Sequence, residues 1–148
     1  MKRIVIAYDG SDGGREALEQ GLQLARNARA VATVVYVRHA PLPIIGDPFY
    51  ERALSKELSR GRDVLVEARL YAAAFGLVPE TELLEGDAGE QILELARARG
   101  ADLIVVGSRG RGAVAEALLG SVSQAIVHSA DRPVLVVKRQ ARRERRAA

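Results

Sequence analysis

Two glycine-containing turns lie close together in the C-terminal half of the chain. Gly107 and Gly110 follow an apolar run, and nine residues separate Gly110 from Gly120 and Ser121. Because glycine has no Cβ, it can adopt positive φ and turn several N–H groups toward one point. The second turn stands at the start of an expected helix, where unpaired N–H groups carry partial positive charge and the hydroxyls of Ser121 and Ser123 add donors. The two turns are therefore suited to holding an anion, and between them a polyphosphate.

Two standard phosphate motifs can be compared with this segment. The Walker pattern G-x-x-x-x-G-K-[ST] does not occur in the chain, which excludes a Walker-type P-loop. Residues 110–115 match a relaxed G-x-G-x-x-[GA] pattern, but they follow the fourth expected strand rather than the first, so a dinucleotide site is not expected. On spacing alone, an ordinary glycine-rich loop with a glycine at a helix start explains the segment equally well.

Apolar runs and amphipathic stretches alternate along the chain and predict the elements that position these turns. Strands are expected over 3–8, 31–37, 79–85, 101–107 and 132–138. Helices are expected over about 12–29, from 49 to about 75, from a capping box at Asp87 to a stop at Gly100, and over about 120–129. The alternation predicts an α/β fold with three layers, α/β/α, around a doubly wound parallel sheet of five strands.

Three details of this pattern carry expectations of their own. Ser11 is the expected N-cap of the first helix. Gly61 weakens the prediction that the long second helix is continuous. The stretch 79–85 alternates polar and apolar residues, which is typical of a half-buried strand at a sheet edge. In a doubly wound sheet, ligands bind beyond the carboxyl ends of the strands, so the loops after the first, second and fourth strands are the expected site.

The length and composition indicate one domain, 1–138, followed by a short basic tail, 139–148. There is no cysteine, which excludes disulfides and thiolate metal sites. No apolar run approaches the roughly 20 residues of a membrane helix, and the N-terminal segment turns polar too early for a signal peptide. We therefore expect a cytoplasmic protein with no membrane partner.

Most of the positive charge belongs to the tail. Residues 138–148 hold six basic side chains and one acidic side chain, so the rest of the chain is slightly acidic although the whole carries +3. A nucleic-acid-binding domain normally carries its charge on the folded body, so a nucleic-acid partner is not expected. Binding of nucleic acid or an acidic surface by the tail alone is an alternative to a solvated terminus.

At full spacing, Gly107-x2-Gly110-x9-Gly120-Ser121 resembles the G-2x-G-9x-G-[ST] signature of the nucleotide-binding branch of the universal stress protein family. The resemblance covers nearly the whole chain. It includes the stretches IVIAYDGSD, GDAGEQILELARARGADLIVVGSRGRG and LLGSVSQAIVHSADRPVLVVK. It implies a five-stranded parallel sheet in the order 3-2-1-4-5, which agrees with the alternation of elements.

By position, the resemblance implies a set of residues that contact an adenine nucleotide: Ala7, Asp9, Val37, Val106, Gly107, Arg109, Gly110, Gly120, Ser121, Val122 and Ser123. Asp9 would accept hydrogen bonds from the ribose, and the backbone of Val37 would meet the adenine. Ala7 stands where some relatives carry proline. From the residues alone, Asp9 could instead cap a turn with Ser11, but its place at the end of the first strand favours the ligand role. Val37 could be plain core.

The same resemblance divides the remaining residues between the nucleotide and its phosphates. Val106 and Gly107 would line the nucleotide. Gly110 and the segment 120–123 would hold the phosphates. Arg109 either steers phosphates or is simply solvated.

These observations favour a regulatory or stress-response protein that binds ATP, or another adenine nucleotide, with Mg²⁺ on the phosphates. Binding could order the 107–119 loop and change a partner surface. The apolar run in 133–137 would be an exposed edge strand, so a homodimer through the fifth strand is expected. The alternative is a slow ATPase or adenylyl-transfer enzyme. The first loop, 8–14, does not match the S-G-G-x-D-S pattern of such enzymes, and Glu116 is the nearest carboxylate, so no catalytic residue is assigned.

Overall fold

A parallel sheet of five strands forms the centre of the structure, a computed structural model that describes residues 1–40, 48–109 and 119–139. The strands are β1 (Arg3–Ala7), β2 (Val31–Arg38), β3 (Glu80–Glu85), β4 (Leu103–Gly107) and β5 (Val134–Val137). Their order is β3-β2-β1-β4-β5, and every neighbouring pair is parallel. The predicted sheet and its strand order are confirmed.

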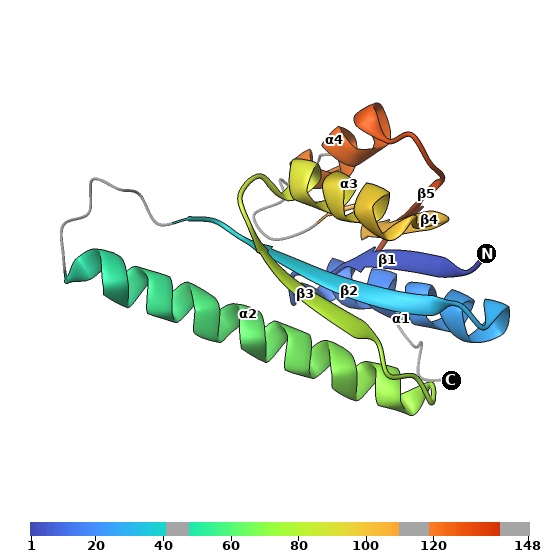
Figure 1. Cartoon of the computed structure of the whole chain (residues 1–148), viewed down its shortest axis with the longest axis horizontal. Helices are drawn as coiled ribbons and strands as arrows, with labels where there is room; N and C mark the ends of the chain where they lie inside the picture. The colour runs from blue at the N-terminus through green and yellow to red at the C-terminus, as the bar shows by residue number, and fades with distance from the viewer. Residues whose placement is uncertain (41–47, 110–118, 140–148) are drawn as a thin grey trace, which may run out of the picture.

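In the described ranges, four helices cover the two faces of the sheet (Figure 1). They are α1 (Asp12–Ala28), α2 (Phe49–Ala74), α3 (Ala88–Arg99) and α4 (Ser121–Ser129). Ile4 and Ile6 of β1 point into the core beneath α1 and α2, whereas Val5 points into the core beneath α3 and α4. All three side chains are at most 1% exposed. Because the strand is buried on both faces, its residues are all apolar and do not alternate with polar ones. The three-layer α/β/α arrangement is therefore confirmed.

The two outer strands differ in how their exposed sides are built. On β3, Glu80 and Glu82 are both ion-paired to Arg99 of α3, and Glu80 is also ion-paired to Arg3, so cations of the same chain pair with the polar face of the strand. On β5, all four residues are aliphatic and half-buried, and the described part of the chain pairs only with its β4 side. The prediction that 79–85 forms an edge strand is confirmed.

Local signals in the sequence place the helix ends. The Ser11 hydroxyl accepts a hydrogen bond from Gly14 N at 3.1 Å and caps α1. Asp87 caps α3 by accepting from Glu90 N at 3.0 Å, and Gly100 ends that helix with a φ of 61°. Gly120 is the N-cap of α4, so that helix begins at Ser121.

Gly61 does not interrupt α2, which runs unbroken for 26 residues. A Cβ on Gly61 would lie 2.5 Å from Leu83 Cδ1 and 3.1 Å from a ring carbon of Tyr36. The glycine therefore serves close packing of the helix on β2 and β3 rather than a break. Among the described residues, no helix has the length and apolar character needed to cross a bilayer.

Candidate functional site

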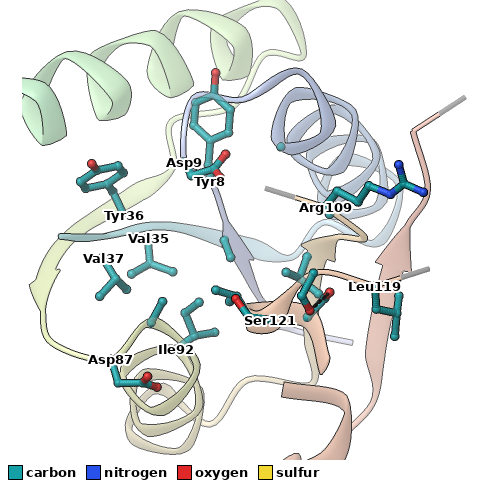
Figure 2. A pocket seen from close by; sticks show the side chains of 18 of the residues that line it. Tyr8, Asp9, Val35, Tyr36, Val37, Asp87, Ile92, Arg109, Leu119 and Ser121 are labelled. Atoms are coloured by element: carbon teal, nitrogen blue, oxygen red, sulfur yellow. Dashed lines mark hydrogen bonds between the residues drawn. The ribbon is translucent and has the colours of Figure 1, made fainter. Parts of the chain in front are cut away.

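A cleft of about 480 Å³ opens at the carboxyl ends of the central strands, between the starts of α1 and α4 (Figure 2). Its volume lies in the range of small-molecule sites. All predicted site residues within the described ranges line it: Ala7, Asp9, Val37, Val106, Gly107, Arg109, Gly120, Ser121, Val122 and Ser123. Gly110 lies outside the described residues. The structure thus gathers segments from four separate parts of the chain around one cavity.

One carbonyl joins the end of β4 to the start of α4. Ser108 O accepts hydrogen bonds from Gly120 N at 2.6 Å and from Ser123 Oγ at 3.0 Å. Ser108 N in turn donates to Val137 O of β5 at 2.8 Å, and the residue is 4% exposed. The two turns singled out in the sequence therefore converge, and a buried backbone group holds them together.

The start of α4 presents hydrogen-bond donors to this cleft. The N–H groups of Ser121, Val122 and Ser123 belong to the first turn, so the helix itself supplies no acceptor for them. They meet no acceptor in the described part of the chain, and the helix dipole adds partial positive charge at this end. An anion placed here would be bound by backbone groups, as the sequence predicts.

The role expected for the Ser123 hydroxyl differs in the structure. We expected this hydroxyl to be a phosphate donor, but its oxygen lies 3.0 Å from Ser108 O and 2.9 Å from Gly120 O, and the residue is 2% exposed. A serine hydroxyl has one proton, which these two carbonyls share. Ser123 can therefore offer its N–H to an anion while its hydroxyl fixes the turn. Ser121 is exposed, so its hydroxyl is accessible.

Asp9 lies at the opposite wall, directly after β1. Its Oδ1 accepts from Ser11 N at 2.9 Å and from Ser11 Oγ at 2.5 Å. The turn-capping role is therefore present in the structure. It also holds the carboxylate at the cleft, so the capping role and a ligand role are compatible.

The third wall is apolar and comes from side chains. Val35 and Val37 of β2 face Ile92 of α3 across the cleft (Figure 2). Ile92 is 3% exposed and Val35 1% exposed, so both belong to the packed core and present a small apolar surface to the cleft beside the half-buried Val37. Ala88 of α3 also lines it.

Two tyrosines at the cleft have raised pKa values. Burial raises the pKa of Tyr8, and the nearby Glu67 carboxylate raises it further, so this phenol stays protonated. Burial is also the main cause that raises the pKa of Tyr36. No group of three or more His, Cys, Asp or Glu side chains that could hold a metal ion occurs in the described ranges. The guanidinium of Arg109 points away from the slot at Val35 (Figure 2).

Several lining residues were missed in the sequence. Ile92 and Ala88 come from α3, and their position depends on how that helix crosses the sheet, which no local pattern gives. Val35 could have been found, because it shares a strand face with Val37 through the two-residue period. Ser108 does not line the cleft but ties its turns together, and it could not have been found, because its contacts are with residues distant in sequence.

Comparisons with known proteins agree with this architecture. The model of the universal stress protein family matches residues 1–138. A protein of Thermus aquaticus, described as the universal stress protein in the QAH/OAS sulfhydrylase 3′ region, is 41% identical over 141 residues, covering 93% of this chain and 99% of that protein.

Solved structures agree as well. The universal stress protein UspA from Lactobacillus plantarum has a TM-score of 0.83 and 24% identity, and the match covers 92% of this chain and 97% of that one. A universal stress protein in complex with cAMP has a TM-score of 0.72 and 26% identity, covering 92% and 96%. The chain described here belongs to the universal stress protein family.

Proposed function

We propose that this protein binds an adenine nucleotide, with ATP and Mg²⁺ as the first candidates, and acts as a regulatory stress-response protein. The observation that carries the proposal is the tie at Ser108, which holds the amide-rich start of α4 beside the same cleft as an apolar slot and a carboxylate. A nucleotide needs these three surfaces together. A base, a sugar and a phosphate chain each require a different chemistry.

Each wall of the cleft fits one part of such a ligand. The slot between Val37 and Ile92 takes the base, with the Val37 backbone available for its polar edge. The Asp9 carboxylate is placed to accept from ribose hydroxyls. The N–H groups at the start of α4 take the phosphates. A relative with 26% identity was solved with cAMP, which supports an adenine nucleotide as the ligand class.

Isothermal titration with ATP, ADP, AMP and cAMP, with and without Mg²⁺, tests this proposal. We expect saturable binding of at least one of these nucleotides by the wild-type protein. Replacing Asp9 by Asn should weaken nucleotides with intact ribose hydroxyls, because a neutral amide is a poorer acceptor than a carboxylate. If none of the four nucleotides gives a heat of binding, and none competes with another for the protein, the proposal is contradicted.

We further propose that binding, rather than turnover, is the function. The carboxylate of Asp87, which lines the cleft, is engaged in capping α3 at 3.0 Å from Glu90 N. A turnover assay with excess ATP separates this proposal from the ATPase or adenylyl-transfer alternative. We expect a rate below about one turnover per minute, far under the roughly 1 s⁻¹ of typical enzymes, and a rate well above one per minute would favour the enzyme.

We also propose that the protein forms a homodimer through β5. The four aliphatic residues of this strand are half-buried in the single chain, and an open apolar edge favours pairing with another strand. Light scattering should give a dimer for the wild type. Replacing Val136 by Lys, which places a charge on the strand, should shift the protein toward monomer. If light scattering gives the mass of a monomer for both the wild type and this variant, the assignment is contradicted.

A further inference from the structure

The first turn of α1 contains two adjacent buried glycines, Gly13 and Gly14. Neither has positive φ, so backbone conformation does not demand glycine at these positions. Glycine in a helix is less favourable than alanine. The reason for glycine must therefore be space, and the two residues pack against segments that form different walls of the cleft.

Gly13 packs against the segment that leaves β4. A Cβ on Gly13 would lie 2.6 Å from Arg109 O, and a Cβ on Gly107 would lie 3.0 Å from Gly13 O. This contact joins backbone to backbone with no side chain between them. A backbone carbonyl cannot rotate away as a side chain can, so a methyl group at Gly13 would push the segment 107–109 outward.

That displacement has a direct route to the start of α4. Ser108 lies in the middle of the displaced segment, and its carbonyl accepts from Gly120 N and Ser123 Oγ. Movement of this carbonyl either breaks the tie or carries the first turn of α4 with it. Gly13 thus acts on the phosphate side of the cleft without lining it.

Gly14 packs against the other wall. A Cβ there would lie 2.7 Å from Asp9 Oδ1, 3.1 Å from Ser11 Oγ and 3.3 Å from Tyr8 Cδ2. The carboxylate of Asp9 is the nearest of these atoms and can rotate. A methyl group at Gly14 would therefore turn this carboxylate away from its present place and strain its hydrogen bonds with Ser11.

We propose that this glycine pair positions the two polar walls of the cleft separately. Gly13 sets the place of the phosphate-binding turns, and Gly14 sets the place of the ribose acceptor. The proposal rests on the nucleotide-binding function proposed above. Both are positioning residues, and neither belongs to the G-2x-G-9x-G-[ST] signature.

The test compares three alanine variants of one helix. Gly13→Ala and Gly14→Ala probe the two walls. Gly21→Ala is the matched control, because its Cβ would lie 2.7 Å from Ile6 Cδ1 in the core, and Gly21 does not line the cleft. Each variant and the wild type are titrated with ATP, adenosine and 2′,3′-dideoxy-ATP, and their thermal unfolding is recorded.

The expected result is a different pattern for each variant. Gly13→Ala should weaken ATP about tenfold while adenosine changes by less than about twofold. Gly14→Ala should reduce the preference for ATP over 2′,3′-dideoxy-ATP about fivefold. Gly21→Ala should lower the unfolding temperature and leave both ratios at the wild-type value. A loss of stability alone cannot imitate these patterns, because it weakens all ligands together.

Amide resonances of the nucleotide-free proteins give a second readout. Gly13→Ala should shift the resonances of Ser108 and Gly120, and Gly14→Ala those of Asp9 and Ser11. If Gly13→Ala does not fold, Gly107→Ala takes its place, because its Cβ meets the same contact at 3.0 Å from the other side.

Two outcomes overturn the proposal, and they are distinguishable. Wild-type binding with unchanged ratios and unshifted resonances in both variants overturns this inference and leaves the proposed function intact. A wild-type protein that binds none of the nucleotides overturns the proposed function and this inference together.

Discussion

Backbone N–H groups are satisfied differently at the two ends of the central sheet. At the amino ends, Asp102 Oδ2 accepts from Lys2 N at 2.6 Å and from Arg3 N at 3.0 Å, so the chain supplies its own anion. At the carboxyl ends, the first-turn amides of α4 meet no acceptor among the described residues. The same chemistry is thus closed at one end and, among the described residues, open at the other. This difference supports the proposal that the donors at α4 serve binding.

The largest effect on binding is expected from adding a side chain at Gly107, at the carboxyl end of β4. In Gly107→Val, the new Cβ would lie 3.0 Å from Gly13 O, and the two methyl groups of valine would add to the overlap. Overpacking of this kind typically costs about 1–3 kcal/mol of stability. We expect ATP affinity to fall by at least about a hundredfold, because the overlap with Gly13 displaces the segment 107–109 that is tied to the start of α4. Calorimetry measures the affinity, and wild-type affinity in this variant would contradict the placement of the site.

A smaller effect is expected from cutting the tie itself. Ser123→Ala removes one of the two hydrogen bonds to Ser108 O, and that carbonyl keeps its bond from Gly120 N. The stability loss measured by urea unfolding should be about 0.5–1.5 kcal/mol. ATP affinity should fall about fivefold to tenfold.

Ser129→Ala, at the exposed end of the same helix, is the matched control and should change neither quantity. Equal behaviour of Ser123→Ala and Ser129→Ala would show that the tie does not hold the site in place.

The apolar wall should respond in a different pattern. Ile92→Val removes one buried methylene from the slot, which is worth roughly 0.8 kcal/mol, so ATP and adenosine should weaken by the same factor of about two to four. Ile126→Val, in the same core and outside the cleft, should cost similar stability without changing either affinity. Competition titrations measure both ligands. A loss confined to ATP would contradict the assignment of this slot to the base.

The smallest effect on binding is expected at the closed end. Backbone hydrogen bonds from Lys2 and Arg3 lower the pKa of Asp102 in the folded state. A lowered folded pKa means that the stabilisation is complete above the ordinary value of about 3.9. It is lost as the pH falls through the lower folded value. Asp102→Asn should therefore flatten the acid limb of the pH–stability curve and leave ATP affinity at neutral pH unchanged. A fall in ATP affinity would show that the two ends of the sheet are not independent.

Much of the fold could be predicted because its signals are local. The alternation of apolar runs and amphipathic stretches predicts the layers, and Ser11, Asp87 and Gly100 act at helix ends as their residue types indicate. The strand order came from the resemblance to a family rather than from the residues. Gly61 was misleading, because its local effect on a helix is unfavourable while its packing against Leu83 depends on tertiary structure.

The candidate site was predicted less completely, and the reason is physical. The signature residues that the structure describes, Gly107, Gly120 and Ser121, line the cleft, because glycines and helix starts mark backbone turns in the sequence. The Ser108 tie and the Gly13 contact join segments far apart in the chain, so no local pattern reveals them. The same limitation explains why the Ser123 hydroxyl was taken for a free donor. Its carbonyl partner at Ser108 becomes evident only when the strand and helix are placed together.

The most direct test of the central claim is a nitrogen-edited NMR titration that follows the amides of Ser121, Val122 and Ser123. If these donors hold the phosphates, ATP should shift all three resonances saturably, with the same affinity as calorimetry gives, and adenosine should leave them near their free positions. Saturation with ATP that leaves these three resonances unmoved would contradict the account.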